Sequence, residues 1–475
     1  WVFVCERMKI RRFGTKVFSW GEGHLGTLGH GDWVAQDLPK PIAALENREV
    51  VKVAAGWKNS LALTRHGEVL QWGWNKPLRS MMFANRFQQA MPGFVEWLQK
   101  FDKGWFTLTN GDCRPVFLDP FIRGSPFSVQ AVDVAAGGEF CLAATDKGEA
   151  VSWGYGFYGQ LGHGEEYTET FSKEPVAVQA LAGEQVVAVA AGFQHSLFLS
   201  STGEVWSCGK TTTGALGLPE EVEHAKQRIF VPKSVQANST TEMGEVVRVA
   251  AGFNHSMALT REGHVYTTGK NAHGQLGHDD FDDRGGFTQV EALRFEKVVD
   301  IAAGQFHSVA LTESGQLYTW GANLNGQCGR PEHHTVINPN LQKKYPALVE
   351  RIQSMHPGTV SLESTAYGTA PVVTKIQAGF TDTVAQTEDG RILILGSRQE
   401  DWLGDLQGAT LQSAAFGFKC AMVVMGSHAE DGRVEGTGLG RHEQKGQEQP
   451  GEPENTSAAD LRFGEEPRAT HQRQR

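Results

Sequence analysis

Residues 298–329 read VVDIAAGQFHSVALTESGQLYTWGANLNGQCG, and this stretch decides the fold. Glycine occurs there at four marks: Gly304 ends an AAG unit, Gly315 follows eleven residues later, Gly321 ends an apolar run, and Gly329 closes a loop. The segments SVALT and QLYTW flank Gly315 and alternate in polarity, which predicts two strands. Glycine supplies the positive φ that the intervening hairpin turn requires.

The same marks recur along the chain. The AAG-like unit ends at Gly56, Gly137, Gly192, Gly252, Gly304, Gly379 and Gly417. A strand ends at Gly21, Gly73, Gly154, Gly209, Gly269, Gly321 and Gly396. An interval of 17 residues separates Gly56 from Gly73 and each of the next five pairs, ending with Gly379 and Gly396. These twelve paired glycines are predicted to be structural, because the backbone must turn or pack closely at each of them.

Each repeat supplies about four short strands, and a sheet of that size cannot bury both faces alone. Sheets repeated around an axis leave only short, protected edges. The first strand-end unit, residues 17–21, has no AAG unit before it, and the last AAG unit, residues 412–417, has no strand-end unit after it. We therefore predict an all-β, seven-bladed β-propeller over residues 17–425, closed by pairing of the N-terminal and C-terminal half-blades.

The composition narrows the protein class. The chain has 475 residues, 56 of them glycine, and a net charge of −10. This charge disfavours broad contact with nucleic acid, and no apolar run approaches the roughly 18 residues that a membrane helix needs. Six scattered cysteines without a CxxC pair indicate neither a disulfide framework nor a zinc site. We expect a monomeric intracellular protein without a cofactor, in the cytoplasm or nucleus, or in an organelle if a transit peptide precedes Trp1.

Four segments depart from the repeat. Residues 1–16 are expected to form a short basic lead-in, and residues 426–475 a disordered tail of mixed charge that buries too little apolar surface to fold. Inserts are expected at about residues 74–132 and 331–371, and long loops on a rigid scaffold often carry binding sites. Helical spacing in the first insert predicts a short amphipathic helix with an apolar side of Phe94, Trp97, Leu98 and Phe101. A helix that only caps a blade edge explains that insert equally well.

The third residue after the AAG glycine is histidine in three successive repeats, at His195, His255 and His307. Equivalent positions lie at the same radius, so these imidazoles are predicted to form an arc on neighbouring blades. Converging imidazoles can bind a metal ion. We favour imidazoles that hydrogen-bond the backbone of their own or the next blade, and predict no metal site.

Other motifs add no catalytic chemistry. Residues 21–26 and 154–159 match G-x-G-x-x-G, but they continue into T-L-G-H and Q-L-G-H as repeat elements and do not open a helix, so a dinucleotide site is not expected. We expect no covalent catalysis and no catalytic residue. Four tryptophans precede strand-end glycines and are predicted to pack between blades: Trp20, Trp72, Trp153 and Trp320.

The repeat V-x-V-A-A-G-x-x-H-S-L-A-L-T-x-x-G-x-V-[YF]-x-W-G-x-N-x-x-G-Q-L-G resembles that of the regulator of chromosome condensation family of propellers. The copies GFQHSLFLSSTGEVWSCG, GFNHSMALTREGHVYTTG and GQFHSVALTESGQLYTWGANLNGQCG carry the resemblance. It covers about 400 of the 475 residues. The resemblance implies a closed seven-bladed ring. The family hosts exchange factors for small GTPases, ultraviolet-B photoreceptors and general interaction modules, so it does not fix one function.

In the exchange-factor members, histidine and aspartate side chains on one ring face contact the GTPase. The resemblance therefore implies a partner-binding role for the third residues after the AAG glycine and for the second residues beside them. The candidates are His195, His255, His307 and Asp382, with Lys58, Glu139, Gln194 and Asn254 at the second position.

The segment GWKNS at residues 56–60 is similar to Gly-Trp-Arg-His-Thr of the plant ultraviolet-B photoreceptor. That receptor needs several such tryptophans clustered with arginines on adjacent blades. The residues equivalent to Trp57 here are Gly138, Phe193, Phe253, Gln305, Phe380 and Phe418. Ultraviolet-B sensing is therefore a minor hypothesis.

We expect a regulatory protein-binding propeller, with nucleotide exchange on a small GTPase as the leading hypothesis. Exchange breaks no covalent bond, so it agrees with a sequence that lacks a catalytic constellation. The competing hypothesis is a non-catalytic scaffold that docks its partner through the two inserts. Chromatin binding is supported only by the basic residues between positions 7 and 16.

Overall fold

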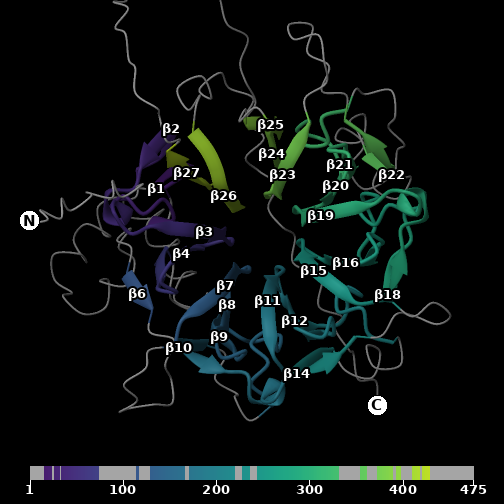
Figure 1. Cartoon of the computed structure of the whole chain (residues 1–475). Helices are drawn as coiled ribbons and strands as arrows, with labels where there is room; N and C mark the ends of the chain where they lie inside the picture. Colours follow the sequence, from purple (N-terminus) through teal and green to yellow (C-terminus); the bar gives the residue numbers. More distant parts are fainter. Residues whose placement is uncertain are drawn as a thin grey trace, which may run out of the picture. The chain divides into compact units, whose positions relative to one another are not determined.

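The computed structural model describes residues 15–23, 26–32, 34–73, 114–116, 129–165, 171–219, 227–235, 243–330, 353–360, 372–388, 392–396, 409–417 and 420–427. These residues form seven antiparallel sheets, six of four strands and one of three. Figure 1 shows them around a common axis, and the first strands of all seven sheets line one central channel. The predicted seven-bladed β-propeller is confirmed.

Strands are numbered in chain order and are grouped below by their position in each blade, from the channel outward. The innermost strands are β3 (Val50–Ala55), β7 (Ala131–Ala136), β11 (Val186–Ala191), β15 (Val246–Ala251), β19 (Val298–Ala303), β23 (Val373–Ala378) and β26 (Ala409–Gly417). The second strands are β4 (Asn59–Thr64), β8 (Phe140–Thr145), β12 (His195–Ser200), β16 (His255–Thr260), β20 (His307–Thr312), β24 (Asp382–Thr387) and β27 (Cys420–Ser427).

The third strands are β5 (Val69–Gly73), β9 (Ala150–Tyr155), β13 (Val205–Lys210), β17 (Val265–Gly269), β21 (Leu317–Ala322), β25 (Ile392–Gly396) and β1 (Thr15–Gly21). The outer strands are β6 (Arg114–Val116), β10 (Phe171–Ala177), β14 (Arg228–Ser234), β18 (Arg284–Gln289), β22 (Gln353–Thr359) and β2 (Gln36–Pro41). Short 3₁₀ turns precede three innermost strands: η2 (Ala43–Leu45), η3 (Gln179–Leu181) and η4 (Glu291–Leu293). Blades I to VI begin at β3, β7, β11, β15, β19 and β23, and blade VII consists of β26, β27, β1 and β2.

Blade VII joins the two ends of the ring. Strand β1 pairs antiparallel with β27, with Phe18 opposite Val423 and Trp20 opposite Ala421. Strand β27 also pairs with β26, so it lies between a strand from each end of the chain. The predicted closure is confirmed. Pairing of the two ends removes the open edges that an unclosed ring would expose.

Apolar side chains fill the spaces between blades. The second strands of blades I to VI are buried along their whole length, because each lies between two neighbouring blades. Trp72 of blade I donates from its indole nitrogen to the carbonyl of Thr27 in blade VII, at 2.8 Å. Trp320 of blade V makes the equivalent bond, also 2.8 Å, to Gln275 of blade IV. These tryptophans bury a large apolar ring and satisfy its one donor across the blade boundary.

Close packing explains the AAG glycine. A Cβ atom on Gly252 would lie 2.1 Å from the imidazole Cε1 of His255 and 2.4 Å from the carbonyl oxygen of Gly304 on the next blade. The strand-end glycine has a different reason. Gly269 has φ +115°, and a Cβ there would lie 2.4 Å from the carbonyl oxygen of Asn254. One glycine is fixed by sterics between blades, and the other also by backbone conformation.

The two predicted inserts also contain outer strands of their blades. Strand β6 lies within residues 74–132 and pairs with β5, and β22 lies within residues 331–371 and pairs with β21. The predicted helix around residues 94–101 lies outside the described residues. So do residues 1–14 of the predicted lead-in and residues 428–475 of the predicted tail. Within the described part of the chain, no helix is long and apolar enough to cross a membrane.

Candidate functional site

Two sets of loops leave each blade at the same end of the sheet. The A–B loop carries the AAG glycine and joins the first strand to the second, and the C–D loop joins the third strand to the fourth. In blade II the amide of Tyr155, where the C–D loop begins, donates to the A–B carbonyl of Glu139 at 2.9 Å. In blade III, Lys210 and Gln194 make the same bond at 2.9 Å. We call this end of the ring the loop face. The B–C turns, which join the second strand of each blade to the third, lie at the opposite end, which we call the hairpin face.

Aromatic rings gather at the centre of the loop face. Phe193 and Phe253 stack with their centroids 4.1 Å apart, and Trp57 lies 5.1 Å from Phe193. Phe253 also contacts Phe306 at 5.5 Å and Phe380 at 6.4 Å. These five residues, here called the aromatic cluster, come from blades I, III, IV, V and VI. All five are half-buried, so part of each ring remains exposed on the loop face.

A missing side chain allows the cluster to span blade II. Gly138 occupies the position equivalent to Trp57 and Phe193, and a Cβ atom there would lie 2.9 Å from the ring of Phe193. Phe193 can therefore lie over blade II and reach Trp57, two blades away. The sequence shows the glycine, but only the ring geometry shows what lies over it.

The central channel opens beneath the cluster and has a volume of about 310 Å³. Its wall is mostly alanine and glycine from the seven innermost strands, and it includes rings of the aromatic cluster. Charged residues occupy the first part of these strands: Lys52 pairs with Asp133 of the next blade, and Arg248 pairs with Asp300 at 2.9 Å. These pairs join blade I to II and blade IV to V, so the channel charges also connect neighbouring blades.

Lys58 and Glu139, two of the predicted partner-binding residues, form an ion pair between blades I and II, and each side chain is only 8% exposed. The Lys58 ammonium lies 4.4 Å from the ring centroid of Trp57, within cation–π range. Burial raises the pKa of the Glu139 carboxyl, and the charge of Lys58 opposes that rise. The pair therefore lies at the edge of the aromatic cluster.

Asn254 and Gln194 are half-buried on the loop face. The carbonyl of Asn254 accepts the amide of Lys270 at 2.8 Å, which joins its A–B loop to the C–D loop. Asp382 is 3% exposed at the start of β24. The partner-binding role of these residues stays a prediction.

The three histidines form the expected arc, with each imidazole buried. His195 Nε2 lies 3.0 Å from Ser256 Oγ, His255 Nε2 lies 3.1 Å from Ser308 Oγ, and His307 Nε2 lies 3.0 Å from Thr383 Oγ1. Each of these bonds crosses to the next blade, as the favoured interpretation has it, and its partner is a side-chain hydroxyl. Backbone groups of His307 and Asp382 also hydrogen-bond the imidazoles of His255 and His307.

The electrostatics agree with neutral imidazoles. Burial lowers the pKa of His195 and His307 to about 4 and that of His255 to about 3. No group of three or more potential metal ligands occurs among the described residues. Buried side chains do not face a partner at the loop face, so the predicted binding role of these histidines also stays a prediction.

Known proteins that resemble this chain have the same architecture. The family model of the RCC1-like domain matches residues 16–280 and 104–462. The chain belongs to the RCC1-like domain family. Its solved neighbours include Prp20p from Saccharomyces cerevisiae, with a TM-score of 0.66, 19% identity and coverage of 88% of this chain and 93% of that one. Human WBSCR16 has a TM-score of 0.65 at 21% identity, covering 87% and 99%. At these identities the likeness shows the fold.

Curated relatives of this RCC1-like domain differ in function. The ultraviolet-B receptor UVR8 of Arabidopsis thaliana is 32% identical over 336 residues, 70% of this chain and 67% of the receptor. Human HERC2, an E3 ubiquitin-protein ligase, is 33% identical over 330 residues, 69% of this chain and 6% of the ligase. The mouse secretion-regulating guanine nucleotide exchange factor is 31% identical over 326 residues, 66% of this chain and 61% of that factor. The chain thus spans less than two thirds of the length of HERC2 and of the exchange factor.

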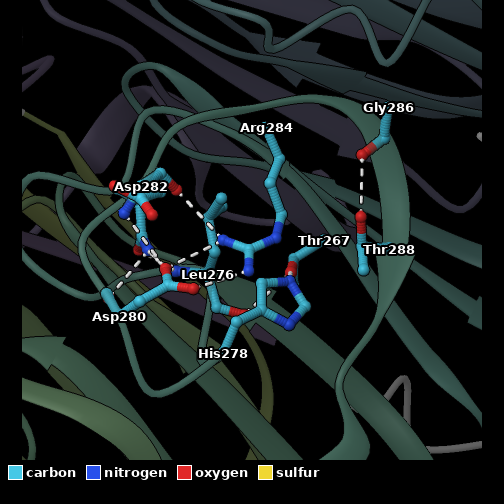
Figure 2. Close-up of polar contacts among 9 residues, drawn as sticks. Thr267, Leu276, His278, Asp280, Asp282, Arg284, Gly286 and Thr288 are labelled. Atoms are coloured by element: carbon cyan, nitrogen blue, oxygen red, sulfur yellow. Dashed lines mark hydrogen bonds and ion pairs between the residues drawn. The ribbon is translucent and has the colours of Figure 1, made fainter.

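The C–D loop of blade IV in this RCC1-like domain is held by its own acids. Figure 2 shows Arg284 facing Asp280, and two hydrogen bonds of 2.9 and 2.7 Å join them. These bonds lower the pKa of Asp280. Lys270 pairs with Asp283 at 2.6 Å. Sequence reasoning missed this network, although the run DDFDDR carries four acids beside one arginine.

The C–D loop of blade II is different. Its segment GYGFYG places Tyr155, Phe157 and Tyr158 on the loop face, all half-buried. The side chains of Lys210 and Arg228, from blade III, lie over these rings. Sequence reasoning considered this segment only as a dinucleotide motif. The signal available in the sequence was three aromatic residues within six positions of a loop.

Proposed function

We propose that this chain is a regulatory protein-binding propeller whose loop face docks a small GTPase and accelerates release of the bound guanine nucleotide. The observation that carries the proposal is the half-buried aromatic cluster at the centre of that face. Residues that dominate protein interfaces are often aromatic, lie near the centre of the patch and are surrounded by polar groups. The half-buried polar side chains of Gln194 and Asn254 supply such polar groups beside the cluster.

The chemistry of the described residues fits exchange. Exchange breaks no covalent bond, because the factor only stabilises the nucleotide-free GTPase. A rigid face and well-placed contacts are sufficient for that task. The three arc histidines have pKa values far below neutral pH and are buried, so they offer no exposed acid or base at pH 7.

Two relatives support a GTPase as the partner. One is the secretion-regulating guanine nucleotide exchange factor of mouse, at 31% identity. The other is yeast Prp20p, whose crystal structure was described together with its binding to Gsp1p and histones. Ultraviolet-B sensing has less support, although UVR8 is a relative. Four of the five residues of the aromatic cluster are phenylalanine, which absorbs at shorter wavelengths than tryptophan.

A nucleotide-release assay tests the proposal. Small GTPases of the nucleus and of organelles are loaded with fluorescent GDP, and the release rate is measured with and without the full chain. We expect at least one member to release GDP about tenfold faster or more. Phe253→Ala removes the ring that contacts three others of the cluster, and we expect it to abolish most of that acceleration.

Phe295→Ala is the matched control. Phe295 is 94% exposed and lies just before Lys297, whose carbonyl accepts from the amide of Glu313 at the B–C turn, so it belongs to the hairpin face. We expect this variant to behave as the wild type. If no GTPase responds, or if Phe295→Ala lowers the rate as much as Phe253→Ala, exchange at the loop face is excluded. Capture of a GTPase without accelerated release would favour the scaffold.

A further inference from the structure

We propose that Tyr155, Phe157, Tyr158, Lys210 and Arg228, here called the aromatic–cation patch, form a second docking site on the loop face. Its ligand is an acidic segment of a protein partner that carries an aromatic or aliphatic anchor between its carboxylates. This inference rests on the proposed function, because it adds a subsite to the same binding face.

The patch is particular to one blade. The third and fourth residues after the strand-end glycine are Phe157 and Tyr158 in blade II. The same two positions hold Thr212 and Thr213 in blade III, Ala272 and His273 in blade IV, and Leu324 and Asn325 in blade V. The repeat therefore does not require aromatic residues at these positions.

The rings hold one another in place. Phe157 meets Tyr158 edge to face with centroids 5.1 Å apart, and it lies nearly parallel to Tyr155 at 6.2 Å. The guanidinium carbon of Arg228 lies 3.9 Å from the centroid of Phe157, and Arg228 Nη1 also donates to the Phe157 carbonyl at 3.2 Å. The Lys210 ammonium lies 5.4 Å from the centroid of Tyr158. The patch is thus ordered before a ligand arrives, which lowers the entropic cost of binding.

Blade IV provides an internal comparison for the charges. In blade IV, Lys270 and Arg284 lie at positions similar to those of Lys210 and Arg228. Lys270 pairs with Asp283, and Arg284 pairs with Asp280, as Figure 2 shows. Lys210 and Arg228 make no salt bridge with a carboxylate among the residues that the structure describes, and residues 220–226 of their own C–D loop lie outside those residues. Two positive charges therefore lie beside exposed aromatic surface without an acidic partner from that part of the chain.

These features fit an acidic protein segment better than a nucleic acid. Carboxylates match guanidinium and ammonium groups, and an apolar anchor can cover the exposed parts of Phe157 and Tyr158. Affinity for a nucleic-acid backbone grows with the number of phosphates that lysine and arginine neutralise, and this patch offers only two such cations.

Fluorescence anisotropy with the full chain tests the inference. The probe is a labelled peptide of sequence EEWEEWEE, compared with KKWKKWKK and with a twelve-nucleotide oligouridylate. We expect the glutamate peptide to bind, to weaken as salt is raised, and to lose about tenfold or more in affinity with Arg228→Glu. Phe157→Ala with Tyr158→Ala should weaken binding to a similar degree.

The control is Lys147→Glu, which makes the same charge change at an exposed residue in the B–C turn of blade II. It should bind the probe as the wild type does. Arg228→Gln and Lys210→Glu repeat the test if Arg228→Glu lowers the melting temperature. No binding of the glutamate peptide, equal binding of the lysine peptide, or equal binding by Arg228→Glu would overturn the inference. Stronger, Arg228-dependent binding of oligouridylate would replace it with a nucleic-acid site.

The two proposals fail separately. The peptide assay does not involve the aromatic cluster, so a negative result there leaves Phe253-dependent nucleotide release intact. A negative exchange panel combined with a positive peptide assay would leave the patch as a docking site of a non-catalytic scaffold.

Discussion

His195 donates from Nε2 to the hydroxyl of Ser256 on the next blade, across 3.0 Å. The direction of the bond follows from the second bond of the serine: Ser256 Oγ donates its one proton to the carbonyl of Ala215, at 2.6 Å, so it must accept from the imidazole. Ala215 lies in the C–D loop of the histidine's own blade. The two bonds therefore cross the same blade boundary in opposite directions.

The same arrangement repeats one blade on, where His255 bonds Ser308 and Ser308 donates to the carbonyl of Gln275 at 2.7 Å. We expect His255→Ala to lower the free energy of unfolding by roughly 2–4 kcal/mol, because it leaves a cavity and a buried hydroxyl without its donor. Urea unfolding measures the change. His66→Ala, at a side chain 77% exposed, is the control and should change stability by less than about 0.5 kcal/mol. Equal effects of the two variants would show that the arc does not stabilise the ring.

The arc histidines should make the ring sensitive to acid. Their pKa values in the folded protein, about 4, 3 and 4, lie below the ordinary value of 6.5. Below pH 6.5 the unfolded chain therefore binds protons that the folded chain does not, and stability is lost as the pH falls from 6.5 to about 4. Each histidine should account for about 2 kcal/mol between pH 7.5 and pH 5.

Urea unfolding across that range checks the pH prediction. His255→Gln keeps a donor but does not titrate, so its stability should depend less steeply on pH than that of the wild type. A slope unchanged by this substitution would mean that the pKa of His255 in the folded ring equals its ordinary value of 6.5.

Substitutions at two glycines distinguish the cost of steric crowding from the cost of backbone strain. A Cβ on Gly252 would meet the imidazole of His255 and the carbonyl of Gly304, whereas Gly326 has φ +78° and nothing within 4 Å of its Cβ position. We expect Gly252→Ala to cost at least about 3 kcal/mol and Gly326→Ala about 1–2 kcal/mol. Thermal and urea unfolding of the two variants give the comparison. A milder effect at Gly252 would show that the blades separate more easily than their packing indicates.

Closure of the ring can be tested by removing β1. A chain that begins at Glu22 lacks the strand that pairs with β27 and exposes the edge around Met422 and Val424. We expect its melting temperature to fall by about 10 °C or more, and a synthetic peptide of residues 15–21 to restore part of the loss by strand addition. Deletion of residues 1–14 is the control. Equal melting of the two truncated chains would contradict a closure that depends on β1.

Much of the fold could be predicted because its determinants are local. A hairpin glycine such as Gly315 has φ +79° and is needed wherever the backbone turns in this way, so the spacing of glycines shows the blades directly. The unpaired half-units at the two ends then required the pairing of β1 with β27.

The candidate site was harder to predict because its contacts join residues far apart in the chain. His195 and Ser256 are 61 positions apart, and no sequence pattern near either residue indicates that the two are in contact. The contact of Trp57 with Phe193 depends on the empty position at Gly138, and Arg228 reaches Phe157 from the next blade. Such contacts follow from the angle between blades, which residue types and spacing do not specify.

Hydrogen exchange of the full chain, with and without the nucleotide-free small GTPase that it engages, tests the central proposal most directly. The loop face should be protected in the complex, in peptides that cover the A–B loops at residues 56–58, 192–194 and 252–254, while the B–C turns at Gly67 and Gly263 exchange as in the free protein. Protection confined to the hairpin face, around Phe295 and these turns, would contradict docking at the aromatic cluster.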